Sequence, residues 1–160
     1  MPQRITPFLW FDGTAEEAIN LYISIFKNSK ITSMTRYGES GPGPSGTVMS
    51  ANFELEGQEF IALNGGPQFP FTEAISFLVN CETQQEVDEL WDKLTAGGGE
   101  GQPCGWLKDR YGLSWQIIPT VLGRMLGDTD PAKAGRVMQA MLQMKKIDIK
   151  TLEAAYAGTS

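Results

Sequence analysis

The sequence predicts an α+β fold, built from two βαβββ modules that are followed by C-terminal helices. Three observations predict it: an internal repeat, strand-like runs on either side of each copy, and a change to helical periodicity after Pro119. A chain of 160 residues is long enough to bury a substantial core. We therefore expect one domain over residues 1–160, with module one at about 1–66, module two at about 72–119 and helices at about 120–157.

The repeat aligns "WFDGTAEEAINLYISIF" with "NCETQQEVDELWDKL". Each copy contains Thr-x-x-Glu, as Thr14 with Glu17 and as Thr83 with Glu86, and this spacing is typical of a capping box at the start of a helix. Apolar residues then recur at helical spacing. They are Ala18, Leu21, Tyr22 and Ile25 in the first copy, and Val87, Leu90, Trp91 and Leu94 in the second. The repeat therefore predicts two equivalent helices.

Strand-like runs surround these two helices. In module one they occupy 4–11, 30–38, 47–57 and 58–66; in module two they occupy 73–80 and, after a glycine-rich turn, 102–109 and 113–119. The stretch from Gly38 to Gly46, "GESGPGPSG", cannot continue a strand and predicts a loop. Two interpretations of this loop stay open, a solvated hairpin connection and a lid over a pocket.

Alternation along three of the strands predicts which side chains face the helices, since successive side chains of a strand point to opposite faces. The residues expected under the helices are Ile5, Leu9, Phe11, Ile75, Phe77, Val79, Trp115 and Ile117. Those expected on the opposite face are Thr6, Phe8, Trp10, Ala74, Ser76, Leu78, Ser114, Gln116 and Ile118.

After Pro119 the pattern becomes helical. The stretch "TVLGRMLG" is followed by Asp130 and Pro131, which suit a helix start, and Asp148 precedes a third segment. The stretch "VMQAMLQM" gathers apolar residues around one helix face: Val137, Met138, Met141, Leu142 and Met144. Together with exposed sheet edges, this face predicts a homodimer. The alternative is that the helix packs on its own chain.

Composition excludes several classes of partner. The 13 Lys and Arg residues against 19 Asp and Glu residues give a net charge of −6, whereas nucleic-acid-binding proteins usually present clustered basic side chains. No apolar run is long enough to cross a bilayer, and the first residues lack a secretory signal. Cys81 and Cys104 have no metal-ligand spacing. We expect a cytoplasmic protein with reduced thiols and with neither a nucleic-acid nor a membrane partner.

The chain contains no histidine. This removes the commonest general base, the commonest transition-metal ligand and the usual partner of a serine or cysteine nucleophile. Any chemistry at a site in this protein must proceed without imidazole.

Several strings together resemble a known family: "FLWFDGTAEEAINLYISIF", "ALNGGP", "ISFLVNC", "CGWLKDRYGLSWQIIP" and "MLQMKKIDI". They are similar to the PhnB-like branch, labelled 3-demethylubiquinone-9 3-methyltransferase, of the glyoxalase/bleomycin-resistance/dioxygenase (vicinal oxygen chelate) superfamily. The resemblance covers nearly the whole chain, including the C-terminal helices. It implies a glyoxalase-like cup, in which each module curls its strands into one half and the helices lie outside.

The resemblance also implies where a metal would lie. Metal-dependent members hold a divalent ion on His, Glu or Gln side chains, and their positions fall here on Thr6, Ala62, Ala74 and Gln116. Alanine has no donor atom, and a stable site needs three or four ligands. The only dense glycine run, Ala96–Gly101, follows a helix and predicts a helix end rather than a nucleotide-binding turn. We therefore expect no metal and no cofactor.

The candidate ligand-binding residues are Thr6, Trp10, Asn64, Ser76, Cys104, Trp106 and Gln116. The amide of Gln116 can donate and accept hydrogen bonds, and indole rings can stack on planar ligands. For Gln116 the alternative is a bond to a neighbouring strand or a buried water, and Phe8 is expected in the core.

The predicted function is small-molecule binding in a metal-free pocket. The alternative is a metal-independent enzyme that acts on a small aromatic or oxygenated metabolite, with Glu73, Cys104 or Lys108 as the only bases within reach. No catalytic residue is singled out.

Overall fold

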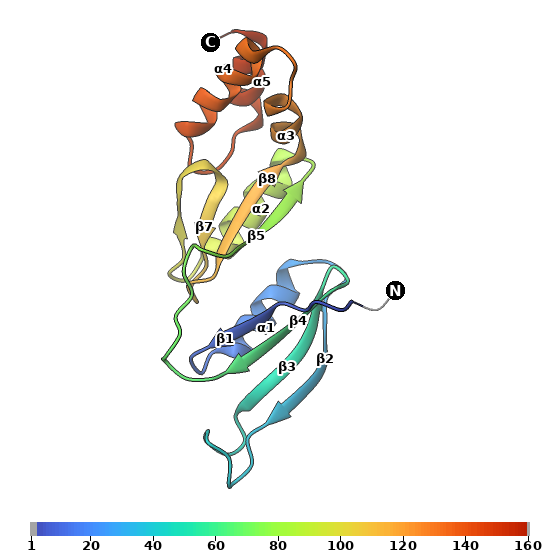
Figure 1. Ribbon diagram of the computed structural model, residues 1–160, viewed down its shortest axis with the longest axis vertical. Coiled ribbons are helices and arrows are strands. Elements are labelled where there is room, and N and C mark those ends of the chain that lie inside the picture. The colour runs from blue at the N-terminus through green and yellow to red at the C-terminus, as the bar shows by residue number, and fades with distance from the viewer. Residues whose placement is uncertain (1–2, 160) are drawn as a thin grey trace. The chain divides into compact units, whose positions relative to one another are not determined.

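The computed structural model describes residues 3–159 and divides the chain into two compact units, which meet in sequence between Phe71 and Thr72. Within the described residues, each unit has the order β-α-β-β-β and forms a four-stranded sheet, and the second unit continues into three further helices (Figure 1). This confirms the predicted α+β fold with paired βαβββ modules and C-terminal helices.

The first unit contains strand β1 (Phe8–Phe11), helix α1 (Ala15–Ile25), and strands β2 (Lys30–Arg36), β3 (Val48–Leu55) and β4 (Gln58–Asn64). The sheet order is β1-β4-β3-β2; β1 runs parallel to β4, and the other pairs are antiparallel. Helix α1 packs on one face of this sheet. The largest fully buried side chains of this core are Phe11, Ile19, Tyr22 and Phe53.

Helix α1 begins differently from the prediction. The Thr14 side chain makes no capping hydrogen bond; instead, Oδ1 of Asn64 accepts a hydrogen bond of 2.9 Å from the backbone N–H of Ala15. Asn64 stands at the end of β4 and its Nδ2 donates to the Val48 carbonyl at 3.0 Å. The capping box predicted at Thr14 was therefore wrong, because a residue distant in sequence satisfies the first turn.

The second unit contains β5 (Ser76–Cys81), α2 (Gln84–Thr95), β6 (Glu100–Gly101), a turn η1 (Pro103–Gly105), β7 (Trp106–Lys108) and β8 (Ser114–Pro119). The sheet order is β5-β8-β7-β6, and β5 runs parallel to β8. Strand β6 was predicted as part of a glycine-rich turn, and its two residues form a strand only through pairing with β7.

The start and end of helix α2 follow the sequence signals. The Thr83 side chain accepts from the backbone N–H of Glu86 at 3.2 Å, as the capping motif predicts. At the other end, Gly97 and Gly98 both have positive φ angles, which glycine adopts readily. The glycine run therefore ends the helix and turns the chain into β6, as expected.

Three helices follow the second sheet: α3 (Thr120–Leu126), α4 (Pro131–Leu142) and α5 (Ile149–Ala157). The side chains of Asp130 and Asp148 cap α4 and α5, accepting from the N–H groups of Ala132 and Thr151. These helices enclose a small core of their own, formed by Leu122, Met125, Val137, Ile147 and Leu152.

That core corrects the picture of an apolar face on α4. Val137 is fully buried, and Met141 and Met144 pack against the same cluster. Met138 and Leu142 remain exposed, at 39% and 50%. Of the five apolar residues predicted to form a dimer face, three therefore pack within their own chain, which was the alternative interpretation.

Residues just before the strands also depart from the predicted alternation. Ile5 and Ile75 precede β1 and β5, and both are exposed rather than packed under a helix. Phe8 lies within β1 and is exposed on the face opposite the helix, as the alternation predicts, so the expectation of a core position for it was wrong. By contrast, Leu9, Phe11, Trp115 and Ile117 are buried as predicted. The alternation holds only where a residue is paired within the sheet, because nothing fixes the direction of side chains beyond the strand ends.

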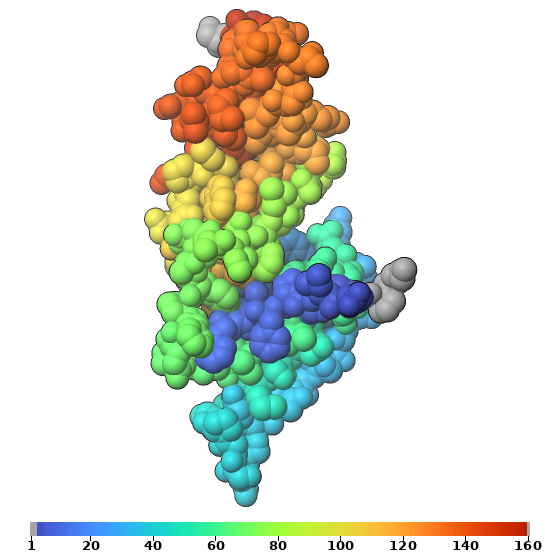
Figure 2. Space-filling model, in the orientation of Figure 1, coloured from blue at the N-terminus to red at the C-terminus, as the bar shows by residue number. Residues whose placement is uncertain are grey.

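The loop from Gly38 to Gly46 joins β2 to β3 outside the sheet, as expected, and projects beyond it (Figure 2). Its base is closed by two backbone bonds, Tyr37 N–H to the Thr47 carbonyl and Gly46 N–H to the Tyr37 carbonyl. A lid function for this loop stays a prediction.

Among the described residues, none of the helices has the length and apolar character that a membrane crossing requires.

Candidate functional site

The candidate site lies on the open face of the second sheet, the face opposite helix α2. Trp115 and Ile117 point from β8 toward α2, so Ser114 and Gln116 point to the opposite face, on which Gln116 is half-buried and Ser114 is fully buried. The strand register then places side chains in two rows across β7, β8 and β5. One row is Lys108, Ser114 and Ser76; the next is Trp106, Gln116 and Leu78.

Gln116 forms a hydrogen bond within this face. Its Nε2 donates to Oγ of Ser76 at 2.9 Å, and both side chains are half-buried. The bond ties β8 to β5 and leaves the amide oxygen of Gln116 without a partner that the structure shows among residues 3–159. An amide with a fixed N–H and an open carbonyl oxygen offers an acceptor at a defined position.

Ser114 is the most unusual residue of the site. It is 0% exposed, and its Oγ has no hydrogen-bond partner among the residues that the structure describes. Most buried polar side chains in proteins are hydrogen-bonded, and leaving such a group unpaired costs roughly 1–3 kcal/mol. A hydroxyl group in this state is a candidate contact for a ligand.

Lys108 carries the positive charge of the site. Its Nζ forms an ion pair with the Glu73 carboxylate. Hydrogen bonding to Glu73 raises the pKa of Lys108 above its ordinary value of 10.5, and the Glu100 carboxylate adds to the same direction. The ammonium group therefore stays protonated throughout the physiological pH range.

Trp106 enters the face from a constrained turn. Cys104 has φ 63° and ψ 32°, a left-handed conformation that costs a non-glycine residue roughly 1–2 kcal/mol. The backbone N–H groups of Cys104 and Gly105 donate to the carbonyls of Met144 and Lys145 at 2.9 and 2.8 Å. The segment between α4 and α5 thus fixes the turn that positions Trp106. The Cys104 thiol is free and half-buried.

The three candidates in the first unit occupy separate local environments. Trp10 is half-buried, and its Nε1 donates to the Gly66 carbonyl at 2.9 Å. Its ring packs edge-on against the Phe69 ring, with 4.9 Å between the ring centroids. Asn64 shares the helix-facing side with its neighbour in register, Phe11, and both its side-chain groups bind backbone. Thr6 precedes β1 and is half-buried.

Of the seven predicted residues, the structure brings together Ser76, Trp106 and Gln116, with Cys104 two residues from Trp106 along the chain. The predicted binding set omitted Lys108 and Ser114, although Ser114 was expected on the same face as Gln116 and Lys108 was named as a base within reach; the register places Lys108 beside Ser114. The signal that would have found them is the pairing of β7 with β8.

The residues at the positions expected for a metal do not fit such a site. Ala62 is fully buried and pairs in register with Leu9 and Ala51 on the helix-facing side, so it does not face the open side as the family resemblance implied. Its neighbours Ile61 and Leu63 have no donor atoms either. No cluster of three or more His, Cys, Asp or Glu side chains suited to a metal ion occurs within residues 3–159.

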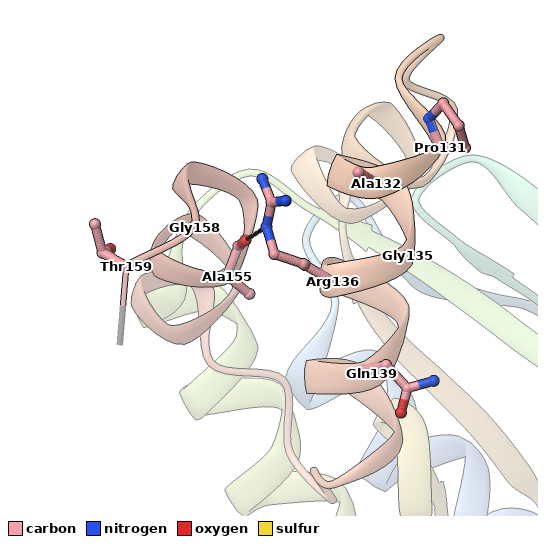
Figure 3. A pocket seen from close by; sticks show the side chains of 8 residues that line it. All are labelled: Pro131, Ala132, Gly135, Arg136, Gln139, Ala155, Gly158 and Thr159. Carbon is pink, nitrogen blue, oxygen red and sulfur yellow. Dashed lines mark hydrogen bonds between the residues drawn. The ribbon is translucent and has the colours of Figure 1, made fainter.

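A cavity of about 680 Å³ lies elsewhere, between α4 and α5 (Figure 3). Small residues line most of it, and Arg136 donates from Nε and a terminal nitrogen to the carbonyls of Ala155 and Tyr156 at 2.8 and 2.9 Å. The guanidinium thus caps the end of α5. None of the seven predicted site residues lines this cavity.

The paired βαβββ units, each with a mixed four-stranded sheet, form a glyoxalase-like fold. The chain belongs to the 3-demethylubiquinone-9 3-methyltransferase family, the PhnB-like branch, whose model matches residues 3–118. The matched range ends before α3, so the resemblance does not extend over the C-terminal helices as expected from sequence.

Solved structures show the same relationship. A Bacillus cereus PhnB protein of the 3-demethylubiquinone-9 3-methyltransferase type is 44% identical, with 74% of this chain and 100% of that chain covered and a TM-score of 0.69. A Pseudomonas aeruginosa protein is 22% identical over 74% and 98% of the two chains, with a TM-score of 0.60. The Listeria monocytogenes fosfomycin resistance protein FosX is 15% identical over 74% and 93%, with a TM-score of 0.50. The comparison with curated proteins gives no match.

Proposed function

We propose that the protein binds a small aromatic or oxygenated molecule on the open face of its second sheet, without a metal ion. One observation carries this proposal: the hydrogen-bonded pair of Gln116 and Ser76 lies beside half-buried Trp106 on the face opposite α2. An indole ring offers a stacking surface, and the amide fixes the orientation of a polar group. A few convergent polar groups beside an aromatic side chain are typical of small-molecule sites.

The family label names methyl transfer, and we propose binding in its place. The glycine run Ala96–Gly101 ends α2 and leads into the two-residue strand β6. In doubly wound sheets, a nucleotide-type cofactor sits instead where a parallel strand turns into a helix. The residues present therefore do not fit that class of cofactor site, and we derive no step through one.

Three further properties belong to the same proposal. The two units form one glyoxalase-like domain, the protein functions in the cytoplasm with Cys81 and Cys104 reduced, and two chains associate as a homodimer. Its partner is a small molecule rather than nucleic acid, which agrees with the net charge of −6.

A metal-independent enzyme is the second candidate. The ion pair of Glu73 and Lys108 favours it, because a carboxylate beside the binding face is the kind of group that acts as a general base. Conversion of a bound probe, with a pH-rate profile that Glu73→Gln abolishes, would support the enzyme. Saturable binding without conversion supports the binding protein.

The test uses phenylacetamide, a neutral aromatic probe with one polar group, followed by NMR of the tryptophan indole N–H signals. We expect saturable shifts at Trp106, while Trp91 on α2 serves as an internal control. Equal shifts at both indoles, or no saturation, would contradict the proposal. Native mass spectrometry of the purified chain then shows whether a small molecule accompanies it.

A further inference from the structure

Three hydrogen-bond donors form a straight row across the open face of the second sheet. Lys108 is the register partner of Ser114 across β7 and β8, and Ser114 is the register partner of Ser76 across β8 and β5. Because neighbouring strands lie about 4.8 Å apart, the row places an ammonium group and two hydroxyl groups within roughly 10 Å. We call Lys108, Ser114 and Ser76 the donor row.

The two hydroxyl groups of the donor row each keep a hydrogen for which the structure shows no acceptor among residues 3–159, and a ligand reaches Ser114 only when a neighbouring side chain moves aside. Ser114 is fully buried, and its Oγ is unpartnered among residues 3–159. Oγ of Ser76 accepts a hydrogen bond from Gln116, which leaves the hydroxyl hydrogen of Ser76 to donate. The sheet supplies one acceptor, the Glu100 carboxylate beside Lys108, and the structure shows none for the two hydroxyl hydrogens among residues 3–159. A ligand oxygen can therefore accept from both hydroxyl groups.

One oxyanion already lies at the donor row. The Glu73 carboxylate pairs with Lys108, and Glu73 belongs to the stretch between β4 and β5 that forms neither helix nor strand. Its side chain is 50% exposed. Exposed ion pairs of this kind contribute little to stability, so a ligand group can displace Glu73 at small cost.

Resting on the proposed function, we infer that the ligand is an aromatic acid whose oxyanion, a carboxylate or a phosphate, replaces Glu73 on the donor row. Its ring then lies beside Trp106 and Gln116, in the next row. Two residues along a strand span about 7 Å, which matches an aromatic ring joined to an acid group by one or two atoms. Glu100, on β6, is the register partner of Lys108, and its carboxylate stays beside the ammonium group when the ligand binds.

The test compares phenylacetate with phenylacetamide, which has the same shape without the charge, by isothermal titration calorimetry of the full chain. We expect phenylacetate to bind at least tenfold more tightly, and Lys108→Met to remove that difference. Phenyl phosphate distinguishes the two acid groups, and tighter binding of it with the same dependence on Lys108 assigns the site to phosphate. Lys93→Met, on α2, is the control for charge and leaves both affinities unchanged.

A second experiment tests whether the ligand displaces Glu73. Glu73→Gln should raise phenylacetate affinity several-fold, because it removes the internal competitor, whereas Glu89→Gln on α2 makes the same change in net charge without effect. The gain should vanish when Glu73→Gln is combined with Lys108→Met, since the two groups then act through one contact. A gain that survives in the double variant would overturn the displacement.

Ser114→Ala gives a readout that does not depend on the charge. It should weaken phenylacetate binding and at the same time raise the urea midpoint, because it removes a buried hydroxyl without a partner. Equal affinities for acid and amide, unchanged in Lys108→Met, would overturn the inference and leave the proposed function standing. Failure of both probes to bind would overturn both.

Discussion

At the scale of single residues, Gln116 shows how one side chain serves both structure and binding. It donates to Ser76 on the neighbouring strand, which is the structural role, and it lies on the open face beside Trp106. A half-buried hydrogen bond of this kind contributes about 1 kcal/mol to stability, because Ser76 can form a hydrogen bond with water when its partner is removed.

We therefore expect Gln116→Ala to lower the free energy of unfolding by about 1 kcal/mol and to weaken phenylacetamide binding roughly fivefold, which is also about 1 kcal/mol. Urea unfolding and calorimetric titration measure the two effects. Gln85→Ala, on the outer side of α2, is the matched control and should leave binding unchanged. A loss of several kcal/mol with affinity intact would show that Gln116 is purely structural.

Residue-scale predictions from sequence succeed where the cause is local. The capping threonine before α2 follows from four consecutive residues, and so does the glycine turn after it. The start of α1 could not be predicted in the same way, because its partner is Asn64, 49 residues away from Ala15. Asn64 was predicted as a ligand contact for the same reason: the sequence does not show which backbone groups a folded strand end will meet.

At the scale of elements, one side chain joins helix α2 to the start of α5. Nε2 of Gln84 donates to the Ile147 carbonyl at 2.9 Å and to Asp88 at 3.0 Å, while its Oε1 accepts from the Ile149 N–H at 2.7 Å. Lys146 and Asp88 add an ion pair of 2.9 Å. Gln84 thus completes the backbone hydrogen bonding of the segment that also holds the Cys104 turn.

Gln84→Ala should lower the free energy of unfolding by about 2 kcal/mol, since it removes two bonds to half-buried backbone groups at about 1 kcal/mol each. Faster amide exchange in residues 144–157 should accompany the loss. The neighbouring Gln85 makes one exposed bond, to Glu89, so Gln85→Ala should cost under about 0.5 kcal/mol. Equal costs for the two variants would contradict the role of Gln84 in docking α5.

A second contact makes the C-terminal helices sensitive to pH. The hydroxyl of Tyr156 donates to Asp128 in a short hydrogen bond. This bond lowers the pKa of Asp128 below its ordinary value of 3.8 and raises the pKa of Tyr156 above 10.0. Stability from Asp128 is fully present above pH 3.8 and is lost as the pH falls through its folded pKa. Stability from Tyr156 is fully present below pH 10.0 and is lost as the pH rises through its folded pKa.

We therefore expect Tyr156→Phe to reduce stability by a constant amount between about pH 4 and pH 10, and by progressively less outside that window. Thermal unfolding of both proteins across the pH range measures the difference. A difference that changes steadily through pH 5 to pH 8 would assign the effect to other groups.

Elements differ in how far sequence predicts them. The three C-terminal helices follow from Asp130, Pro131 and Asp148, since caps and apolar spacing are local signals. Strand β6 could not be predicted, because two residues carry no periodicity and become a strand only by pairing with β7. The donor row was also beyond reach, since it depends on the register of three strands that are separated in sequence.

At the scale of the whole molecule, the family match covers both sheets and leaves out the three C-terminal helices. The matched residues end at 118, within β8, and the helices beyond them enclose their own core. Within the second unit, the segment that joins α4 to α5 is nevertheless hydrogen-bonded to Gln84 on α2 and to the turn at Cys104. The addition is therefore fixed to the part of the unit that carries Trp106, rather than tethered by a linker.

The proposed homodimer depends on surfaces that the chain leaves open. Strands β1 and β2 are the edges of the first sheet, and β5 and β6 are the edges of the second. On α4, Met138 and Leu142 stand one helical turn apart and are both exposed, whereas Val137 packs inside its own unit. Unpaired edges and exposed apolar pairs both favour association with a second copy, and two-fold symmetry is the commonest arrangement.

Sedimentation equilibrium at micromolar concentration should therefore give near twice the 17.6 kDa mass of one chain. Substituting Met138→Lys with Leu142→Lys should raise the dissociation constant at least tenfold, because two charges would be buried in the interface. Gln139→Lys with Gln143→Lys adds the same charges on α4 and its C-cap at exposed polar positions, and should leave the dimer intact. A monomer for the unaltered chain would refute the dimer. A dimer that both double variants preserve equally would assign the association to the sheet edges instead of α4.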